Sequence, residues 1–192
     1  MKVLSLLGSP RANGNTALVL RYLEQKLEEK GLEINRIHVG GLSIQGCKEC
    51  FGCKRDDESL CCFDDDAIHV LRDILAADVI LWASPTFCWG FPAQLKALMD
   101  RMYCLLKWKE GEEGYRSMLE GKLMALLVTA GGEEKDNADI LGKAYQQMVS
   151  FMKCRSVGIV YIAPWCDESP LNREVCTKLD EFVDSFVSAK IK

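Results

Sequence analysis

The chain has 192 residues, a formal net charge of -4 and ten cysteines, and 48% of its residues are hydrophobic. This length and composition exclude disordered, collagen-like and coiled-coil classes, because a domain of this size buries enough apolar surface to need no disulfides. The slight acidity disfavours nucleic acid and anionic membranes as partners. We expect no signal peptide and no membrane span, and therefore a cytoplasmic protein whose thiols stay reduced.

Short apolar runs alternate with stretches of helical periodicity, which is the pattern of a parallel sheet covered by helices on both faces. The acidic run Asp64-Asp65-Asp66 is assigned to the first turn of the second helix, where acidic groups stabilise the positive helix end. We expect one α/β domain over residues 1–192. In chain order the pattern predicts strand 2–7, a helix that ends at Gly31, strand 32–39, helix 64–77, strand 78–83, helix 93–105, strand 122–129, helix 137–153, strand 157–162 and a final helix capped by Ser169 with Pro170 at its first position.

Two connecting segments, residues 40–63 and 106–121, are longer than ordinary connections, and long loops in compact domains are often functional. The first is rich in cysteine. The second contains Trp108 and Tyr115 around a run of glycine and glutamate. This second segment is a lid, a subunit contact or a solvated loop, and the last two are favoured equally.

The loop after the first predicted strand, residues 8–16, supplies hydroxyls, amides, an arginine and two glycines at the start of a helix. Helix amides and short polar side chains form a phosphate-binding site. The loop has neither the three-glycine dinucleotide spacing nor the lysine of a P-loop, so a monophosphate fits better than a triphosphate or dinucleotide. The alternative is an ordinary polar turn in which Asn15 or Thr16 caps the helix.

Two further loops follow predicted strands that end at the same edge of the sheet, where ligands of doubly wound folds bind. Residues 84–92 contain Phe87, Trp89 and Phe91, which either stack on a flat ligand or fill core or interface space. Residues 129–132 contain two glycines, which either let backbone approach a ligand or simply make a turn.

Cysteines at positions 47, 50 and 53 recur every third residue, and another cysteine follows at position 61. Three thiolates on a tightly coiled loop, with a fourth from further along, are typical of an iron-sulfur cluster. Zinc sites more often use two separated cysteine pairs, so zinc and reduced thiols are the alternatives. Because Cys61 and Cys62 are adjacent, spacing alone does not identify the fourth ligand.

The other cysteines and the two histidines have no partner at ligand spacing. We expect His38 and His69 to lie at a strand end or on the surface. Buried, inert thiols are expected at Cys88, Cys104, Cys154, Cys166 and Cys176.

Several motifs together resemble the flavodoxin-like NADPH-dependent FMN reductase family across nearly the whole chain. With the cysteines of residues 40–63, the chain looks most like the iron-sulfur flavoprotein branch of that family. The resemblance implies a flavodoxin-like three-layer sandwich with five parallel strands in the order 2-1-3-4-5. The motifs are Gly8-Ser9-Pro10-Arg11 with Gly14-Asn15-Thr16, Ser84-Pro85-Thr86-Phe87, Gln94-Leu95-Lys96, Asp100-Arg101 and Gly131-Gly132.

The resemblance also implies FMN, with its phosphate on the first loop, its rings beside the second and its pyrimidine edge near the third. Family members commonly have tyrosine where Phe87 stands, so the hydrogen bond of that hydroxyl is missing here. Cys61 stands where the last family cysteine lies relative to Asp65-Asp66. The FMN residues so implied are Ser9, Arg11, Asn13, Asn15, Thr16, Ala17, Pro85, Thr86, Phe87, Cys88, Ala130, Gly131 and Gly132, and the ligands of a [4Fe-4S] cluster are Cys47, Cys50, Cys53 and Cys61.

The expected function is an FMN-dependent oxidoreductase that passes electrons from a ferredoxin or NAD(P)H donor to a small acceptor through the cluster. Since the cofactors carry the reaction, no catalytic acid or base is required. One alternative is a cluster-free NAD(P)H-dependent FMN or quinone reductase, and another is a non-enzymatic electron carrier or redox sensor. We expect a homodimer or homotetramer.

Overall fold

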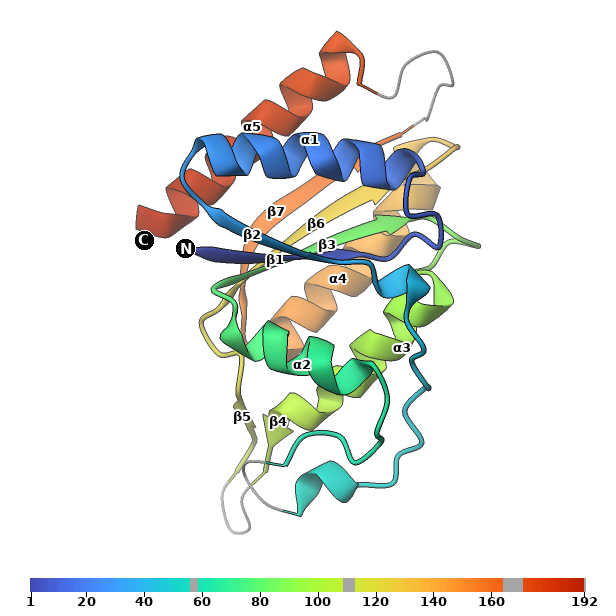
Figure 1. The fold of residues 1–192 in the computed structure, drawn as a ribbon, viewed down its shortest axis with the longest axis vertical. Helices are drawn as coiled ribbons and strands as arrows, with labels where there is room; N and C mark the ends of the chain where they lie inside the picture. The colour runs from blue at the N-terminus through green and yellow to red at the C-terminus, as the bar shows by residue number, and fades with distance from the viewer. Residues whose placement is uncertain (56–58, 109–112, 164–170, 192) are drawn as a thin grey trace.

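The computed structural model describes residues 1–55, 59–108, 113–163 and 171–191. Its centre is a parallel sheet of five strands in the order β2-β1-β3-β6-β7 (Figure 1). Counted along the chain this is the 2-1-3-4-5 order that the resemblance implied, and the flavodoxin-like fold is confirmed. The strands are β1 (Lys2–Leu7), β2 (Glu33–Ile37), β3 (Val79–Pro85), β6 (Leu123–Thr129) and β7 (Arg155–Ile162).

Helices cover both faces of the sheet, α1 and α5 on one and α2, α3 and α4 on the other (Figure 1). Successive strand residues serve opposite cores, so Leu4 and Leu6 of β1 pack under α2 and α3 while Val3 and Leu7 face α1. This explains why the central strands are apolar throughout. The helices are α1 (Asn15–Glu29), α2 (Ala67–Ala76), α3 (Ala93–Arg101), α4 (Asp139–Phe151) and α5 (Arg173–Ile191).

The predicted end of the first helix is confirmed. Gly31 has a φ of 77°, its amide donates to Glu28 O at 2.8 Å, and the amide of Leu32 donates to Leu27 O at 3.1 Å. This is a Schellman motif, which needs a residue that tolerates left-handed backbone.

The predicted start of the last helix is wrong. Helix α5 begins at Arg173, and Asn172 Oδ1 accepts a hydrogen bond from the Val175 amide at 2.9 Å. Asn172 therefore caps the helix, because its side chain bonds an amide of the first turn that has no partner within the helix. Ser169 and Pro170 lie outside the described residues.

The predicted start of the second helix is also wrong, since α2 begins at Ala67. The acidic run does lie at the start of α2, because Asp65 Oδ1 accepts a hydrogen bond from the Ala67 amide at 3.1 Å. The carboxylates of Asp65 and Asp66 also accept hydrogen bonds from the amides of Gln45 and Ser43, at 2.9 and 2.7 Å. These contacts reach about twenty residues back along the chain, which is why helix-end electrostatics did not predict them. The acidic run anchors a loop.

Helix α3 ends earlier than predicted and continues as a 3₁₀ turn, Met102–Leu105, into β4 (Leu106–Lys107), which pairs with β5 (Arg116–Ser117) in an antiparallel hairpin. The rings of Tyr103, Trp108, Tyr115 and Phe151 follow one another at centroid distances of 5.3, 5.3 and 5.4 Å. Within the described residues, the segment 106–121 is thus packed against the ends of α3 and α4. Its role as a subunit contact stays a prediction.

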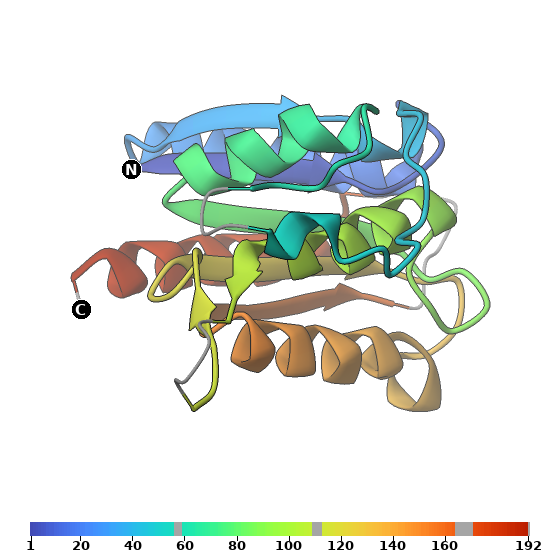
Figure 2. The ribbon, with the colours of Figure 1, turned by 90° about the horizontal axis from the view of Figure 1, so that it is seen from below.

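Residues 42–66 are called the cysteine loop here, and its described parts, 42–55 and 59–66, lie outside α3 and beside the β4–β5 hairpin. Figure 2, seen from below, shows its 3₁₀ turn Gly52–Lys54 (teal) in front of α3. No helix in the described part of the chain is both long and apolar enough to cross a membrane.

Candidate functional site

The three loops predicted to bind a ligand meet at the carboxyl edge of the sheet. Backbone hydrogen bonds join them, from Gly8 N to Ala83 O at 2.8 Å and from Thr86 N to Thr129 O at 2.9 Å. The strand order reverses between β1 and β3, and ligands of doubly wound sheets bind at such a reversal.

The first loop, residues 8–16, leads into the positive end of a 15-residue helix. Gly14 stands at the N-cap position of α1 with extended backbone, and no described side chain caps the helix there. Neither Asn15 nor Thr16 acts as a cap, so that alternative is wrong. Amides of the first turn have no partner inside the helix and attract an anion. The first loop thus fits a phosphate.

Two residues just after β2 support this loop, and sequence reasoning missed both. His38 Nε2 lies 2.7 Å from Ser9 O. A Cβ added at Gly40 would lie 2.2 Å from Ser9 O and 2.5 Å from Ser9 C, so only glycine lets the two segments approach this closely. The sequence contained one signal for these two residues, namely that a histidine and two adjacent glycines stand at the end of the second predicted strand. His38 does lie at a strand end, and His69 is exposed, as predicted.

The predicted FMN residues of the first loop differ in burial, and Asn15, one of the four predicted to hold the phosphate, is half-buried. Ser9, Thr16 and Ala17 are buried, and Thr16 Oγ1 lies 2.7 Å from Thr129 Oγ1, which ties the first loop to the third. Arg11 and Asn13 are exposed, and Asn13 Oδ1 accepts a hydrogen bond from Arg21 at 3.1 Å. The buried group shapes the loop, while the exposed group is free to move toward a ligand.

The second loop turns sharply after β3. Phe87 and Gly90 exchange two backbone hydrogen bonds, at 3.0 and 2.9 Å, across a two-residue turn in which Cys88 and Trp89 have φ of 47° and 58°. Side chains other than glycine are strained there. The turn leaves Phe87 47% and Trp89 62% exposed, so these two side chains do not fill the core. Cys88 is also exposed, so the prediction that it is buried was wrong.

Two features of the second and third loops fit a ligand with hydrogen-bonding edges. The Thr86 hydroxyl is buried and has no hydrogen-bond partner among the described residues. A buried polar group without a partner is costly, and a bound molecule would relieve that cost. Gly131 is exposed, and a Cβ built on it would meet no described atom within 4 Å. Backbone is therefore open to a ligand at Gly131.

The four cysteines of the predicted cluster motif line one small cavity of about 20 Å³ in the cysteine loop. Cys62 does not line it; its Sγ lies 3.5 Å from that of Cys50. No group of three or more Cys, His, Asp or Glu side chains within the described ranges is placed to hold a metal ion. The four thiols are the donors that an iron-sulfur cluster requires. The cavity, however, has room for about one water molecule and must widen to admit a cluster. The cavity is lined by Cys47, Cys50, Cys53 and Cys61 together with Cys104, Arg101 and neighbouring residues.

The local environment distinguishes these thiols. A hydrogen bond from the Gly52 amide, with a further one from Cys62, lowers the pKa of Cys50. Burial raises the pKa of Cys53, and it raises the pKa of Cys104 to about 12. Cys104 is therefore the buried, neutral thiol that was predicted.

Two of the remaining cysteines are only partly covered. Cys154 and Cys176 are half-buried, and burial raises the pKa of Cys154 to about 12. Neither is therefore the fully buried thiol that was predicted. Cys166 lies outside the described residues.

A buried arginine holds the cysteine loop to α3. The Arg101 side chain is 0% exposed and forms a bidentate ion pair with Asp65, at 2.8 and 3.0 Å. Burial acts to raise the pKa of Asp65, but hydrogen bonds from Arg101 and the Gln45 amide outweigh it and hold that pKa below its usual value. Removing either partner would leave the other charge buried alone.

Two lysines also hold the loop, one by donating to its carbonyl oxygens and one by donating from the loop to a carbonyl oxygen outside it. Lys107 is buried, and its Nζ donates to Cys53 O at 3.2 Å and to Ser59 O at 2.6 Å. Lys54 Nζ donates to Tyr103 O at 2.7 Å and lies over the Tyr103 ring, 4.0 Å from its centroid. Burial lowers the pKa of Lys54. Sequence reasoning missed all three cations of this loop, because their partners lie 36 to 54 residues away.

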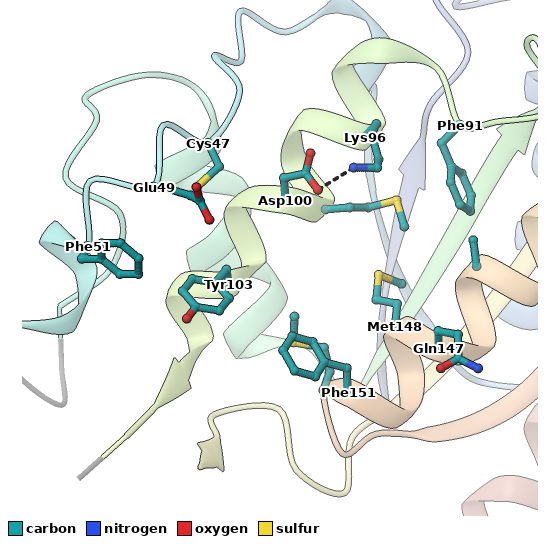
Figure 3. A pocket seen from close by; sticks show the side chains of 13 residues that line it. Cys47, Glu49, Phe51, Phe91, Lys96, Asp100, Tyr103, Gln147, Met148 and Phe151 are labelled. Atoms are coloured by element: carbon teal, nitrogen blue, oxygen red, sulfur yellow. Dashed lines mark hydrogen bonds and ion pairs between the residues drawn. The ribbon is translucent and has the colours of Figure 1, made fainter. Parts of the chain in front are cut away.

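A cavity of about 750 Å³ opens between α3 and α4 (Figure 3). Phe91, at the end of the second loop, and Met148 and Phe151, on α4, form much of its apolar wall. Cys47 and Phe51 reach it from the cysteine loop. The cavity therefore extends from the end of the candidate flavin site to the cysteine loop.

Comparison with known proteins agrees with this arrangement. The chain matches the family model for NADPH-dependent FMN reductase over residues 1–161. It is 39% identical over 101 residues to an iron-sulfur flavoprotein of Methanocaldococcus jannaschii, covering 53% of this chain and 51% of that one. It is 31% identical over 135 residues to one of Archaeoglobus fulgidus, covering 70% and 57%. The chain thus spans about half the length of the curated relatives it matches.

Solved structures share the fold. An NAD(P)H:quinone oxidoreductase from Methanothermobacter marburgensis has a TM-score of 0.72 at 16% identity, covering 99% of this chain and 98% of that one. An FMN-dependent NADH-azoreductase from Bacillus anthracis, in complex with FMN, has a TM-score of 0.71 at 15% identity, covering 100% of both. The family match extends over most of the chain, and the motif-bearing loops lie together at one sheet edge. The chain belongs to the NADPH-dependent FMN reductase family, and among its curated members it resembles the iron-sulfur flavoproteins.

Proposed function

We propose that this protein is an FMN-dependent oxidoreductase that takes electrons from NAD(P)H or a reduced ferredoxin and passes them to a small acceptor. The observation that carries the proposal is the meeting of three groups at one sheet edge. These are the uncapped start of α1, the Thr86 hydroxyl that lacks a partner among the described residues, and the open backbone at Gly131. An anion, a hydrogen-bonding ring edge and a close backbone approach are what a flavin mononucleotide requires.

The chain's own residues bind and orient the cofactor. The α1 amides and Ser9 hold the phosphate, and the exposed Arg11 closes over it. Thr86 donates to the ring system, and Phe87 and Trp89 shield it from water. Bound FMN supplies hydride and single-electron chemistry, and a bound cluster supplies single-electron transfer.

We further propose that Cys47, Cys50, Cys53 and Cys61 hold a [4Fe-4S] cluster. Their shared cavity and thiolate chemistry support this, as does the similarity to proteins named iron-sulfur flavoproteins. The α3–α4 cavity borders both regions and is wide enough for a small aromatic acceptor.

The remaining proposals concern assembly and location. We propose a cytoplasmic homodimer or homotetramer in which the exposed Phe87 and Trp89 lie at a subunit contact. Sedimentation equilibrium of the flavin-loaded protein tests this. A monomer at micromolar concentration contradicts it.

The central experiment measures FMN binding by flavin fluorescence for the wild type and for two matched threonine variants. Thr86→Val removes a hydroxyl that has no described partner, so we expect weaker FMN binding with no loss of stability of the flavin-free protein. Thr16→Val breaks the hydrogen bond to Thr129, so we expect it to destabilise the flavin-free protein. Equal FMN binding by wild type and Thr86→Val contradicts the proposed ring site.

Anaerobic purification separates the enzyme from its alternatives. Turnover is measured with NADH, NADPH and reduced ferredoxin against quinones and peroxide, and iron and acid-labile sulfide are assayed on the same sample. Flavin with turnover but without iron and sulfide indicates the cluster-free reductase. Flavin without turnover of any pair indicates an electron carrier or sensor, and failure to bind added FMN contradicts the whole proposal.

A further inference from the structure

We propose that Arg101 is a positioning residue that selects Cys61, rather than the adjacent Cys62, as the fourth ligand of the cluster and adjusts the cluster's reduction potential. This inference rests on the proposed function, because it presumes that the cysteine loop holds a cluster. It is carried by the contacts of Arg101 and by the contrast between two neighbouring cysteines.

The guanidinium of Arg101 is wholly buried, and every group it contacts belongs to the cysteine loop or the residues just after it. Nη1 donates to Gln45 O at 3.0 Å and Nη1 and Nη2 both donate to Asp65. Nε donates to Cys61 Sγ at 2.9 Å. The fork of Arg101 is planar and fixed by the Asp65 carboxylate, so the Nε–H bond has one direction, toward this sulfur.

The two adjacent cysteines have different surroundings. Cys61 is half-buried and lines the same cavity as Cys47 and Cys53, whereas Cys62 is exposed and does not line it. Cys62 Sγ lies beside Cys50, and a Cβ added at Gly52 would come within 2.9 Å of it. Of the two, Arg101 bonds Cys61, on the cavity side of the loop. This contact distinguishes two candidate ligands that the spacing of the cysteines in the sequence could not distinguish.

The contact has an electrostatic consequence. A cluster that gains an electron becomes more negative, and a buried cation with an N–H bond to one of its sulfur ligands stabilises that state. Arg101 therefore raises the reduction potential of the cluster. The flavin site is formed by other loops, whereas within the described residues the hydrogen bonds of Arg101 go to Cys61, Gln45, Phe63 and Asp65, so we expect the FMN potential to stay unchanged.

The first test compares Cys61→Ser with Cys62→Ser, two identical changes at neighbouring positions. The readouts are iron and acid-labile sulfide per chain after anaerobic purification. We expect Cys62→Ser to keep the wild-type content and Cys61→Ser to lose about half or more of both. Loss in Cys62→Ser, or full retention in both variants, overturns the ligand assignment. A wild type that holds flavin but no iron or sulfide contradicts the proposed cluster itself and, with it, this inference.

The second test measures the midpoint potentials of cluster and FMN in Arg101→Lys, which keeps the charge but loses the planar fork. Arg36→Lys is the control, because it makes the same change at a partly buried arginine that pairs with Glu24 of α1, on the face of the sheet opposite to α3. We expect the cluster potential to fall in Arg101→Lys and to stay unchanged in Arg36→Lys, with the FMN potential constant in both. If Arg101→Lys does not fold, the double variant Arg101→Gln/Asp65→Asn removes both buried charges together. A cluster potential equal to that of the wild type in the folded variant overturns the positioning role.

Discussion

The two candidate cofactor regions are built in opposite ways. The first loop, residues 8–16, is short and lies against the sheet through backbone contacts, including Gly8 N to Ala83 O at 2.8 Å and the close approach of Gly40 to Ser9. Among its described residues the cysteine loop has little regular structure, and long side chains hold it. Arg101 of α3 and Lys107 of β4 reach into the loop, and Lys54 reaches out of it to the carbonyl oxygen of Tyr103.

The difference explains how each region would bind its cofactor. A phosphate is bound by amides of fixed direction, and such amides are positioned by a strand that runs into a helix. A cluster needs thiolates that adjust when it assembles, and the cavity of about 20 Å³ must widen for it. A loop held by long side chains, through one buried ion pair and several hydrogen bonds to carbonyl oxygens, can keep its attachment while its backbone moves.

The largest expected effect comes from removing the charge of Asp65. Asp65→Asn leaves the buried Arg101 guanidinium without its counter-ion, and breaking a buried pair in this way costs about 3–5 kcal/mol. We expect the free energy of unfolding in urea to fall by that order. The FMN site lies on a different region and should still bind flavin in the folded fraction.

Asp100→Asn is the matched control, because it removes the carboxylate charge of an exposed ion pair. Asp100 pairs with Lys96 at 2.6 Å, and both residues lie on α3, the helix that carries Arg101. Exposed pairs of this spacing contribute about 0.3–0.5 kcal/mol. Equal losses in the two variants would contradict the proposed role of Asp65 as an anchor.

The Asp65 pair also predicts a pH dependence. The folded-state pKa of Asp65 is lowered, so its contribution to stability is complete above the unfolded pKa of about 4 and is lost as pH falls through the folded pKa. Unfolding free energies of wild type and Asp65→Asn, measured from pH 7 downward, should converge in acid. Parallel curves would show that the carboxylate charge is not the stabilising group.

The next effect is expected at the backbone-built region. Gly40→Ala places a Cβ within 2.2 Å of Ser9 O, and because that neighbour is backbone, the loop itself must shift. Overpacking of this kind costs about 1–3 kcal/mol. We expect FMN affinity to fall by about tenfold or more, measured by fluorescence titration. Gly46→Ala is the control, because a Cβ there meets no described atom within 4 Å, and it should bind FMN as the wild type does.

The same contrast decides what could be read from the sequence. The five strands and the first loop were predicted correctly because they depend on local pattern, namely apolar runs, a polar bend and a helix start. The same local reasoning assigned the Asp64-Asp65-Asp66 run to a helix start, where Asp65 does bond the Ala67 amide, but it missed the ion pair of Asp65 with Arg101. The partner of Asp65 lies 36 residues away on α3, and no periodicity connects the two.

The conformation of the aromatic turn was not predicted, for a different reason. Phe87 and Trp89 were weighed either as stacking on a flat ligand or as filling core or interface space, and their exposure excludes only the core. The turn places Cys88 and Trp89 in left-handed backbone without the glycine or asparagine that announces such a turn. Tertiary packing, not residue preference, decides the conformation here.

A smaller effect is expected from the exposed arginine of the first loop. Arg11→Ala removes a cation that contributes to ligand binding but little to folding, so we expect FMN to bind about tenfold more weakly while the unfolding free energy changes by about 0.5 kcal/mol or less. Arg72→Ala, at an exposed position of α2, is the control for loss of positive charge. If stability falls as much as binding in Arg11→Ala, Arg11 is a structural residue and the phosphate site is built without it.

The smallest effect is expected at the turn itself. Cys88→Gly relieves the strain of left-handed backbone, which costs about 1–2 kcal/mol. It also raises the conformational entropy of the unfolded chain, which destabilises the folded state by about 0.5–1 kcal/mol, so we expect the unfolding free energy of the flavin-free protein to rise by about 0.5 kcal/mol. Cys88→Ala keeps the strain and is the control for loss of the thiol. Urea unfolding compares the two, and equal stabilities would mean that packing has already removed the strain. A more stable Cys88→Gly that also binds FMN more weakly would mean that the strained turn holds Phe87 in place for the flavin, since strain is retained where it positions a ligand.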